Sequence, residues 1–178
     1  MKKNLFAILI GLMPTLLMAQ PLALNNKTSL PPNASVASTN NDANPAKATR
    51  RAARESKQFN KTTKAFSADF KNASDVQWTS DKINFVGTFT KEGTRNMVWY
   101  GKNGQLLYTM LTYSSDKLPK AERRIMEDEF GDYKITLVDE VHQGDTIVYV
   151  VHLENDHHIK LVTVCNGETN IYKDYKKI

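Results

Sequence analysis

The strongest constraint on the fold is a series of short apolar runs separated by turn signals. Eight such runs follow one another between residues 76 and 175, and two of the connections are the pairs Asn103-Gly104 and Asn166-Gly167. Asn-Gly is a dipeptide that favours tight β-hairpins. Connections this short leave no room for parallel crossovers, so the runs predict antiparallel strands. The predicted strands cover residues 76–78, 83–89, 94–100, 105–113, 133–142, 146–154, 158–165 and 170–175.

Two segments have a helical period, one before the first strand and one between the fourth and fifth strands. Residues 61–72 place Phe66 and Phe70 on one face, which predicts a helix with two phenylalanines directed at a core. A second apolar stripe runs between Pro119 and Gly131. Proline is favoured in the first turn of a helix and glycine just past its end, so these two residues predict where the second helix starts and stops.

The two parts of the chain resemble each other in order. Each runs helix, three strands, Asn-Gly turn and strand, and the two Asn-Gly pairs are 63 residues apart. Phe70 and Tyr133 share this offset. We therefore predict an α+β fold, an antiparallel β-sheet with helices packed on one face, built from two pseudo-repeated helix-plus-meander halves.

The N-terminus has the three regions of a secretory signal peptide. Lys2 and Lys3 come first, residues 5–18 are apolar, and the small Ala19 offers a cleavage point. The apolar run is shorter than the about 20 residues that span a bilayer, and Pro14 interrupts it. Residues 1–19 therefore predict a signal peptide cleaved after Ala19, no membrane span, and a periplasmic or secreted protein.

Residues 20–58 are predicted to be a disordered basic spacer ahead of a folded domain at 59–178. The stretch is rich in Asn, Ser, Thr, Ala and Pro, and only nascent helix is expected, near residues 46–57. Seven basic residues stand between Lys47 and Lys64 against the single acid Glu55, whereas residues 65–178 hold 14 Lys/Arg and 17 Asp/Glu. The basic arm is interpreted as a solvated linker, with an anionic lipid or polymer as the alternative partner. No aromatic residues are interleaved with the basic residues in the first part of this arm, so nucleic-acid binding is not predicted.

A family resemblance covers the folded part. The residues that carry it are Ala65-Phe66, Asp75-Val76-Gln77-Trp78, Phe85, Phe89, Tyr100, Leu118-Pro119, Phe130-Gly131-Asp132-Tyr133-Lys134-Ile135 and Tyr149-Val150-Val151. With these motifs, residues 60–178 resemble the PepSY-like, beta-lactamase-inhibitor-like domains of exported Bacteroidetes proteins. The resemblance implies helices on an antiparallel sheet, a periplasmic or secreted location, and no catalytic or cofactor residues. Spaced apolar residues and turns of this kind specify a fold better than a function.

The aromatic residues of the strands are the candidate binding residues. Residues 97–100, 106–108 and 147–151 are apolar at both odd and even positions. Either these strands are covered on both faces, or one face carries exposed aromatics, which mark interaction sites. The candidates are Trp99, Tyr100, Tyr108 and Tyr149. The predicted function is an exported non-enzymatic binding domain of the cell envelope that engages a protein or peptide through the open sheet face.

The alternative prediction is a small-ligand or metal site on a histidine-rich hairpin. His152, His157 and His158 are weak candidate ligands, and a two-residue turn would place His152 opposite Ile159. Surface histidines are the competing interpretation. Cys165, the only cysteine, cannot form an internal disulfide and is predicted to be buried and inert at the end of an apolar strand. No catalytic residue and no cofactor is predicted.

Overall fold

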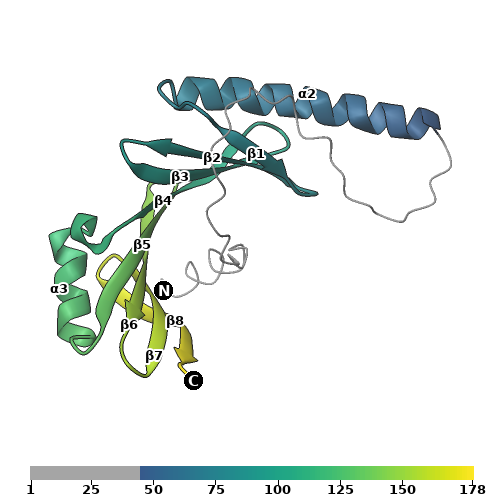
Figure 1. The fold of residues 1–178 in the computed structure, drawn as a ribbon. Coiled ribbons are helices and arrows are strands. Elements are labelled where there is room, and N and C mark those ends of the chain that lie inside the picture. Colours follow the sequence, from purple (N-terminus) through teal and green to yellow (C-terminus); the bar gives the residue numbers. More distant parts are fainter. Residues whose placement is uncertain (1–44) are drawn as a thin grey trace, which may run out of the picture. The chain divides into compact units, whose positions relative to one another are not determined.

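The computed structural model describes residues 45–178 (Figure 1). The predicted signal peptide and residues 20–44 of the predicted spacer lie outside the described residues. The elements are α2 (Pro45–Asp69), β1 (Gln77–Ser80), β2 (Asn84–Lys91), β3 (Thr94–Gly101), β4 (Leu106–Tyr113), the 3₁₀ turn η1 (Ser115–Lys117), α3 (Lys120–Glu129), β5 (Lys134–Gln143), β6 (Thr146–Glu154), β7 (His158–Cys165) and β8 (Glu168–Lys176).

The strands form one antiparallel sheet in which every strand pairs with the next along the chain, in the order β1 to β8. The predicted α+β fold and its two meanders of four strands are thereby confirmed. Glycine sets the turns: Asn166 and Gly167 both have positive φ, at 52° and 79°, as the tightest hairpin turn requires. At Asn103-Gly104 only the glycine does, and the pairing register shifts beside it, between Trp99 and Tyr100.

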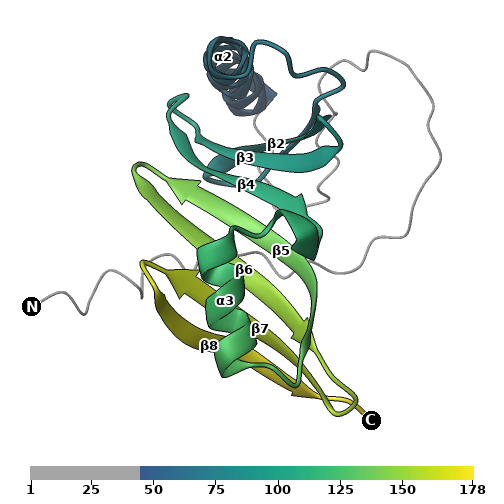
Figure 2. The same ribbon diagram turned by 90° about the vertical axis from the view of Figure 1, so that its left-hand side faces the viewer.

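Both helices pack on the same face of the sheet. Val98 of β3 belongs to the core under α2 and pairs with Thr109 of β4, which lies four residues before Tyr113. Tyr113 pairs with Val138, and both belong to the core under α3. Because side chains alternate along a strand, these residues share one face. Figures 1 and 2 show α2 and α3 on one side of a sheet that bends away from them.

An aromatic core lies under α2, with Phe66 at its centre. The Phe66 ring centroid is 5.1 Å from that of Phe70, 5.2 Å from that of Trp78 and 5.4 Å from that of Phe89. A Cβ at Gly87 would come within 3.1 Å of the Trp78 ring, so glycine leaves the room for that ring to cross β2. The buried residues of this cluster are Phe66, Phe85, Phe89, Val98 and Tyr100.

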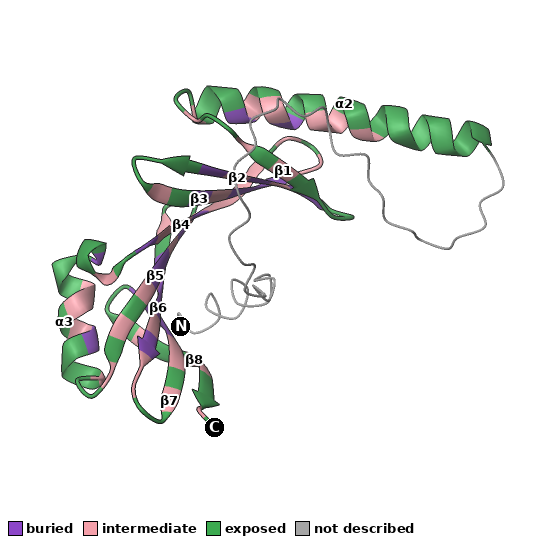
Figure 3. Cartoon of the chain, viewed as in Figure 1, coloured by how far each residue is buried: buried purple, intermediate pink, exposed green. Residues whose placement is uncertain are grey.

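Helix α2 is longer than the sequence pattern predicts. It begins at Pro45 and continues to Asp69, so residues 45–58 are helical and do not belong to a disordered spacer. The apolar stripe starts only at Phe59, which is why the helical period is absent from the earlier residues. Residues 46–54 nevertheless consist of Ala, Lys, Arg and one Thr, and the first three have high helix propensity. The docked C-terminal turns therefore extend toward the N-terminus as an exposed helix (Figure 3).

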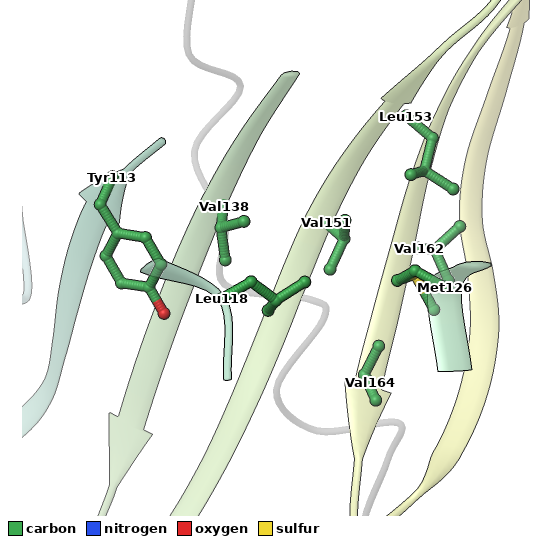
Figure 4. Packing of buried hydrophobic residues seen from close by; sticks show 8 residues of the cluster. All are labelled: Tyr113, Leu118, Met126, Val138, Val151, Leu153, Val162 and Val164. Carbon is green, nitrogen blue, oxygen red and sulfur yellow. The ribbon is translucent and has the colours of Figure 1, made fainter. Parts of the chain in front are cut away.

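A second core lies under α3. Met126, the one buried residue of this helix, is directed at side chains of β6 and β7 (Figure 4), and Leu118, the residue that follows η1, belongs to the same cluster. Tyr113 of β4 belongs to the same cluster, so the first half of the sheet contributes to the core of the second. The buried members are Tyr113, Leu118, Met126, Val138, Val151, Leu153, Val162 and Val164.

The two edges of the sheet are exposed. Neither β1 nor β8 contains a buried residue, whereas β2 to β7 all do (Figure 3). Within residues 45–178, no helix combines the length and the apolar composition needed to cross a membrane.

Candidate functional site

The open face of the sheet is the side opposite α2 and α3. Residues adjacent in sequence to the core positions point to it, because side chains alternate along each strand. Within residues 45–178 no helix packs on this face (Figure 1). The apolar side chains that the strand pairings assign to it are Val86, Met97, Trp99, Tyr108, Met110, Leu137, Val141, Val148, Val150, Ile159, Leu161, Cys165 and Tyr175.

Trp99 and Tyr108 lie together on the open face. They are direct partners in the pairing of β3 with β4, and their rings stack with centroids 4.4 Å apart and planes at 19°. Trp99 exposes only 4% of its surface, and Tyr108 is half-buried. Burial, with a smaller contribution from the charge of Asp81, raises the pKa of Tyr108 to about 12. Tyr108 is therefore a neutral phenol at physiological pH and is the more accessible of the two rings.

Tyr100 and Tyr149, the other two candidates, lie on the helix-covered side. Tyr100 is fully buried under α2, and its hydroxyl donates to Asp69 at 2.8 Å. Tyr149 is half-buried beside the α3 cluster, and burial followed by the charge of Glu140 raises its pKa. These positions correct the sequence interpretation, because consecutive strand residues such as Trp99 and Tyr100 must point to opposite faces.

A buried carboxylate lies within the apolar centre of the open face. Asp139 of β5 exposes 6% of its surface. Its Oδ1 accepts a hydrogen bond from the Thr112 hydroxyl at 2.6 Å, and its Oδ2 lies 2.9 Å from Nε2 of His152. Neither Thr112 nor Asp139 is among the site residues predicted from the sequence. One feature of the sequence could have revealed this site: Asp139 follows Leu137-Val138 directly within an apolar strand. A carboxylate buried in such a strand needs hydrogen-bonding partners from neighbouring strands.

The order of these three groups decides what they can do chemically. In a nucleophilic relay the histidine stands between the hydroxyl and the carboxylate and takes the hydroxyl proton. Here the Asp139 carboxylate stands between the Thr112 hydroxyl and the His152 ring. The hydroxyl donates to the carboxylate, so the arrangement anchors three strands and does not activate Thr112 as a nucleophile.

The candidate histidines are separated by the sheet. His152 is on the open face, whereas His158 is on the helix side, where its Nδ1 lies 2.7 Å from Asp174. His157 is exposed in the turn. Among residues 45–178, no three His, Cys, Asp or Glu side chains are grouped as a metal ion requires. The predicted pairing of His152 with Ile159 was also wrong, because His152 pairs with Leu161. The loop between β6 and β7 is longer than predicted, and in it the Asn155 side chain accepts the backbone N–H groups of His157 and His158.

Cys165 lies at the end of β7 on the open face. It exposes 6% of its surface. Burial, followed by the charge of Glu168, raises the pKa of its thiol. The thiolate is the reactive form of cysteine, so its population at neutral pH is small.

We expect Cys165 to resist thiol reagents in the folded protein. At about pH 7, modification by a disulfide reagent should be at least about tenfold slower in the native chain than in the chain unfolded in guanidinium chloride. Because the thiol pKa is raised, the native rate should keep rising with pH above the ordinary thiol pKa of about 8.5, where the rate of the unfolded chain levels off. Absorbance of the released thiol measures both rates, and equally fast modification of native and unfolded chains at neutral pH would contradict this expectation.

Solved structures show similarity to this chain at the level of the fold. A DUF2874 family protein from Bacteroides uniformis is 16% identical with a TM-score of 0.57, over 65% of this chain and 87% of that one. A BLIP-like protein from Bacteroides fragilis is 16% identical with the same TM-score, over 66% and 84%. A protein from Bacteroides eggerthii, provisionally described as periplasmic, is 16% identical with a TM-score of 0.57, over 65% and 86%.

No protein-family model and no curated protein matches the chain. The predicted resemblance to beta-lactamase-inhibitor-like domains is supported as a likeness of fold, through the BLIP-like neighbour. The PepSY-like part of that resemblance stays a prediction.

Proposed function

We propose that this chain is an exported, non-enzymatic binding domain of the cell envelope, and that it holds a protein or peptide partner on the open face of its sheet. The observation that carries the proposal is a set of apolar side chains across the open face from β2 to β8, buried in the centre and half-buried or exposed toward the ends, without a described helix on it. The predicted signal peptide and the provisionally periplasmic neighbour favour a location outside the cytoplasm. The name BLIP-like, given to another neighbour, favours protein binding.

The accessible part of this surface lies toward its two ends. Over β7 and β8, Ile159 is 37% exposed and Tyr175 is 50% exposed, and they are direct partners in the strand pairing. Toward the other end, Tyr108 and Met97 are half-buried. Aromatic and methionine side chains of this kind are enriched in protein interfaces. Trp99 is buried and stacks against Tyr108, so it positions Tyr108 and does not itself contact the partner.

The non-enzymatic part of the proposal is supported by the polar groups on the open face. The carboxylate of Asp139 stands between Thr112 and His152, and the Cys165 thiol is buried with a raised pKa. Neither arrangement supplies an activated nucleophile.

A matched pair of isoleucines tests the proposal. Ile159 is on the open face, and Ile171 of β8 is on the helix side and is 49% exposed. A photoreactive amino acid placed at residue 159 should crosslink an envelope protein in living cells, and the same group at 171 should not. Crosslinking from 171 alone, equal crosslinking from both positions, or none from 159 would overturn the proposal.

The identified partner then allows a quantitative measurement. Ile159→Glu combined with Tyr175→Ala should weaken binding by about tenfold or more, because truncating a hot-spot side chain of an interface costs more than about 1 kcal/mol. The control variant, Ile171→Glu, should change the affinity by less than about twofold. Circular dichroism melting curves of both variants show whether the fold is retained.

A further inference from the structure

A pocket of about 480 Å³ lies beneath the N-terminal half of α2. Its floor comes from the loop between β1 and β2 and from the β3–β4 hairpin, over which α2 passes (Figure 1). The hairpin lies close to the helix at Gly104, where a Cβ would come within 3.0 Å of the Lys61 side chain. Glycine therefore allows this close approach. This pocket is separate from the aromatic and apolar residues of the open face.

Lys102, at the β3–β4 hairpin, presents an unsatisfied ammonium group at this pocket. Its Nζ is buried and has no hydrogen-bond partner within the described residues. The atom lies 3.7 Å from the centroid of the Phe85 ring and 3.8 Å from Oε1 of Glu55, which is too far for a hydrogen bond. A buried ammonium has three donors to satisfy, and leaving them unmade costs free energy. An acceptor-rich group in the pocket would satisfy them after a small movement of this flexible side chain.

The pocket carries an excess of positive charge. Arg51, Arg54, Lys82 and Lys102 line it together with two carboxylates, Glu55 and Asp81, which leaves two positive charges. Within residues 45–178, the head groups of Arg51, Arg54 and Lys82 make no ion pair.

Both carboxylates of the pocket interact with other groups of the chain, Glu55 through an ion pair with Lys102 and Asp81 through hydrogen bonds. Glu55 faces Lys102, and Oδ1 of Asp81 accepts the backbone N–H groups of Ile83 and Asn84 at 2.7 Å and 2.6 Å. Arg51, Arg54 and Lys82 line the pocket at exposed positions and therefore keep N–H donors available to a bound group.

We propose that this pocket binds a phosphate-class dianion. Arg51 and Arg54 are three residues apart on α2 and lie on the same side of the helix, so both guanidinium groups can donate to one bound group. A phosphomonoester carries a charge of about −1.5 to −2 and three acceptor oxygens. It matches the two uncompensated charges, whereas a single carboxylate neutralises only one. Arg51 and Arg54, which belong to the basic arm interpreted from the sequence as a solvated linker, thereby acquire a binding role.

Titration of the chain with inorganic phosphate, followed by calorimetry at constant ionic strength and at about pH 8, tests the proposal. Phosphate should bind saturably at one site, and acetate should bind at least about tenfold more weakly. Arg51→Gln with Arg54→Gln should weaken phosphate binding by about tenfold or more, as should Lys102→Met, which retains an apolar stem against Phe85. The matched control, Arg50→Gln with Lys57→Gln, removes the same charge from exposed positions of α2 outside the pocket and should change binding by less than about twofold.

Equal weakening by the pocket and control pairs would mean non-specific attraction to a basic helix and would overturn the proposal. Absence of saturable binding, or equal affinity for acetate and phosphate, would overturn it as well. Sedimentation with vesicles of phosphatidic acid and of phosphatidylcholine identifies the source of the group. Arg-dependent binding to phosphatidic acid supports a lipid phosphate, and phosphate binding without vesicle binding supports a soluble one. Failure of these assays leaves the crosslinking test of the open face unaffected.

Discussion

Replacing Phe66 by alanine is expected to lower the free energy of unfolding by about 3–5 kcal/mol, the usual cost of removing a buried phenylalanine. Phe66 is 5% exposed, and its ring contacts three other aromatic rings within 5.4 Å between centroids. Helix α2 has two buried residues, Thr62 and Phe66, and the larger side chain of Phe66 contributes most to packing the helix on the sheet. Its loss therefore removes both burial and the attachment of a helix.

Urea denaturation followed by tryptophan fluorescence measures this change, because Trp78 lies against the Phe66 ring. Lys64→Ala is the control, an exposed position of the same helix two residues away, and should change stability by less than about 0.5 kcal/mol. A loss below about 1 kcal/mol for Phe66→Ala would show that α2 is not docked on the sheet in solution.

The second large effect is expected at α3. Met126→Ala should lower the free energy of unfolding by about 2–5 kcal/mol, since Met126 is 1% exposed and is the one buried residue of this short helix. It lies against the side chains of β6 and β7 seen in Figure 4. Arg124→Ala, at an exposed position of α3, is the matched control and should leave stability nearly unchanged. If Met126→Ala changed stability as little as the Arg124→Ala control, the packing of α3 on β6 and β7 would be excluded.

The two core variants together test whether the halves fold as one unit. Tyr113 of the first half is buried in the core of the second, and its hydroxyl donates to Glu140 at 2.5 Å. We therefore expect a single unfolding transition for each variant. In the double variant Phe66→Ala with Met126→Ala the losses should add within about 0.5 kcal/mol, because the two residues belong to separate clusters. Two separate transitions would show that the halves unfold independently.

Much of this fold could be predicted from local patterns. The eight strands, the turns at Asn103-Gly104 and Asn166-Gly167, and the helix after Pro119 all follow from residue periods and from glycine at positions that need positive φ. Within each half the short connections exclude parallel pairing, which leaves a meander of antiparallel strands, whereas the connection between β4 and β5 contains α3 and is long enough for either direction. These features depend on neighbours in sequence, which is why the sequence carries them.

The candidate site was predicted less well, because it depends on contacts between distant strands. Apolar residues at consecutive positions hide which face each one occupies, and only the helices decide that Tyr100 lies in the core under α2 whereas Trp99, also buried, lies on the opposite face. The approach of Asp139 to Thr112 and His152 requires the register of three strands. One loop two residues longer than expected moved the partner of His152 from Ile159 to Leu161.

The amino-acid sequence by itself determined the number of strands, their antiparallel order and the division into two helix-plus-meander halves, since alternation and turn chemistry are local properties. Tertiary structure alone decided which side of the sheet the helices cover, and hence which aromatic residues line the open face. It also brought the basic side of α2 over Lys102, because a pocket between a helix and two turns exists only after the chain has packed.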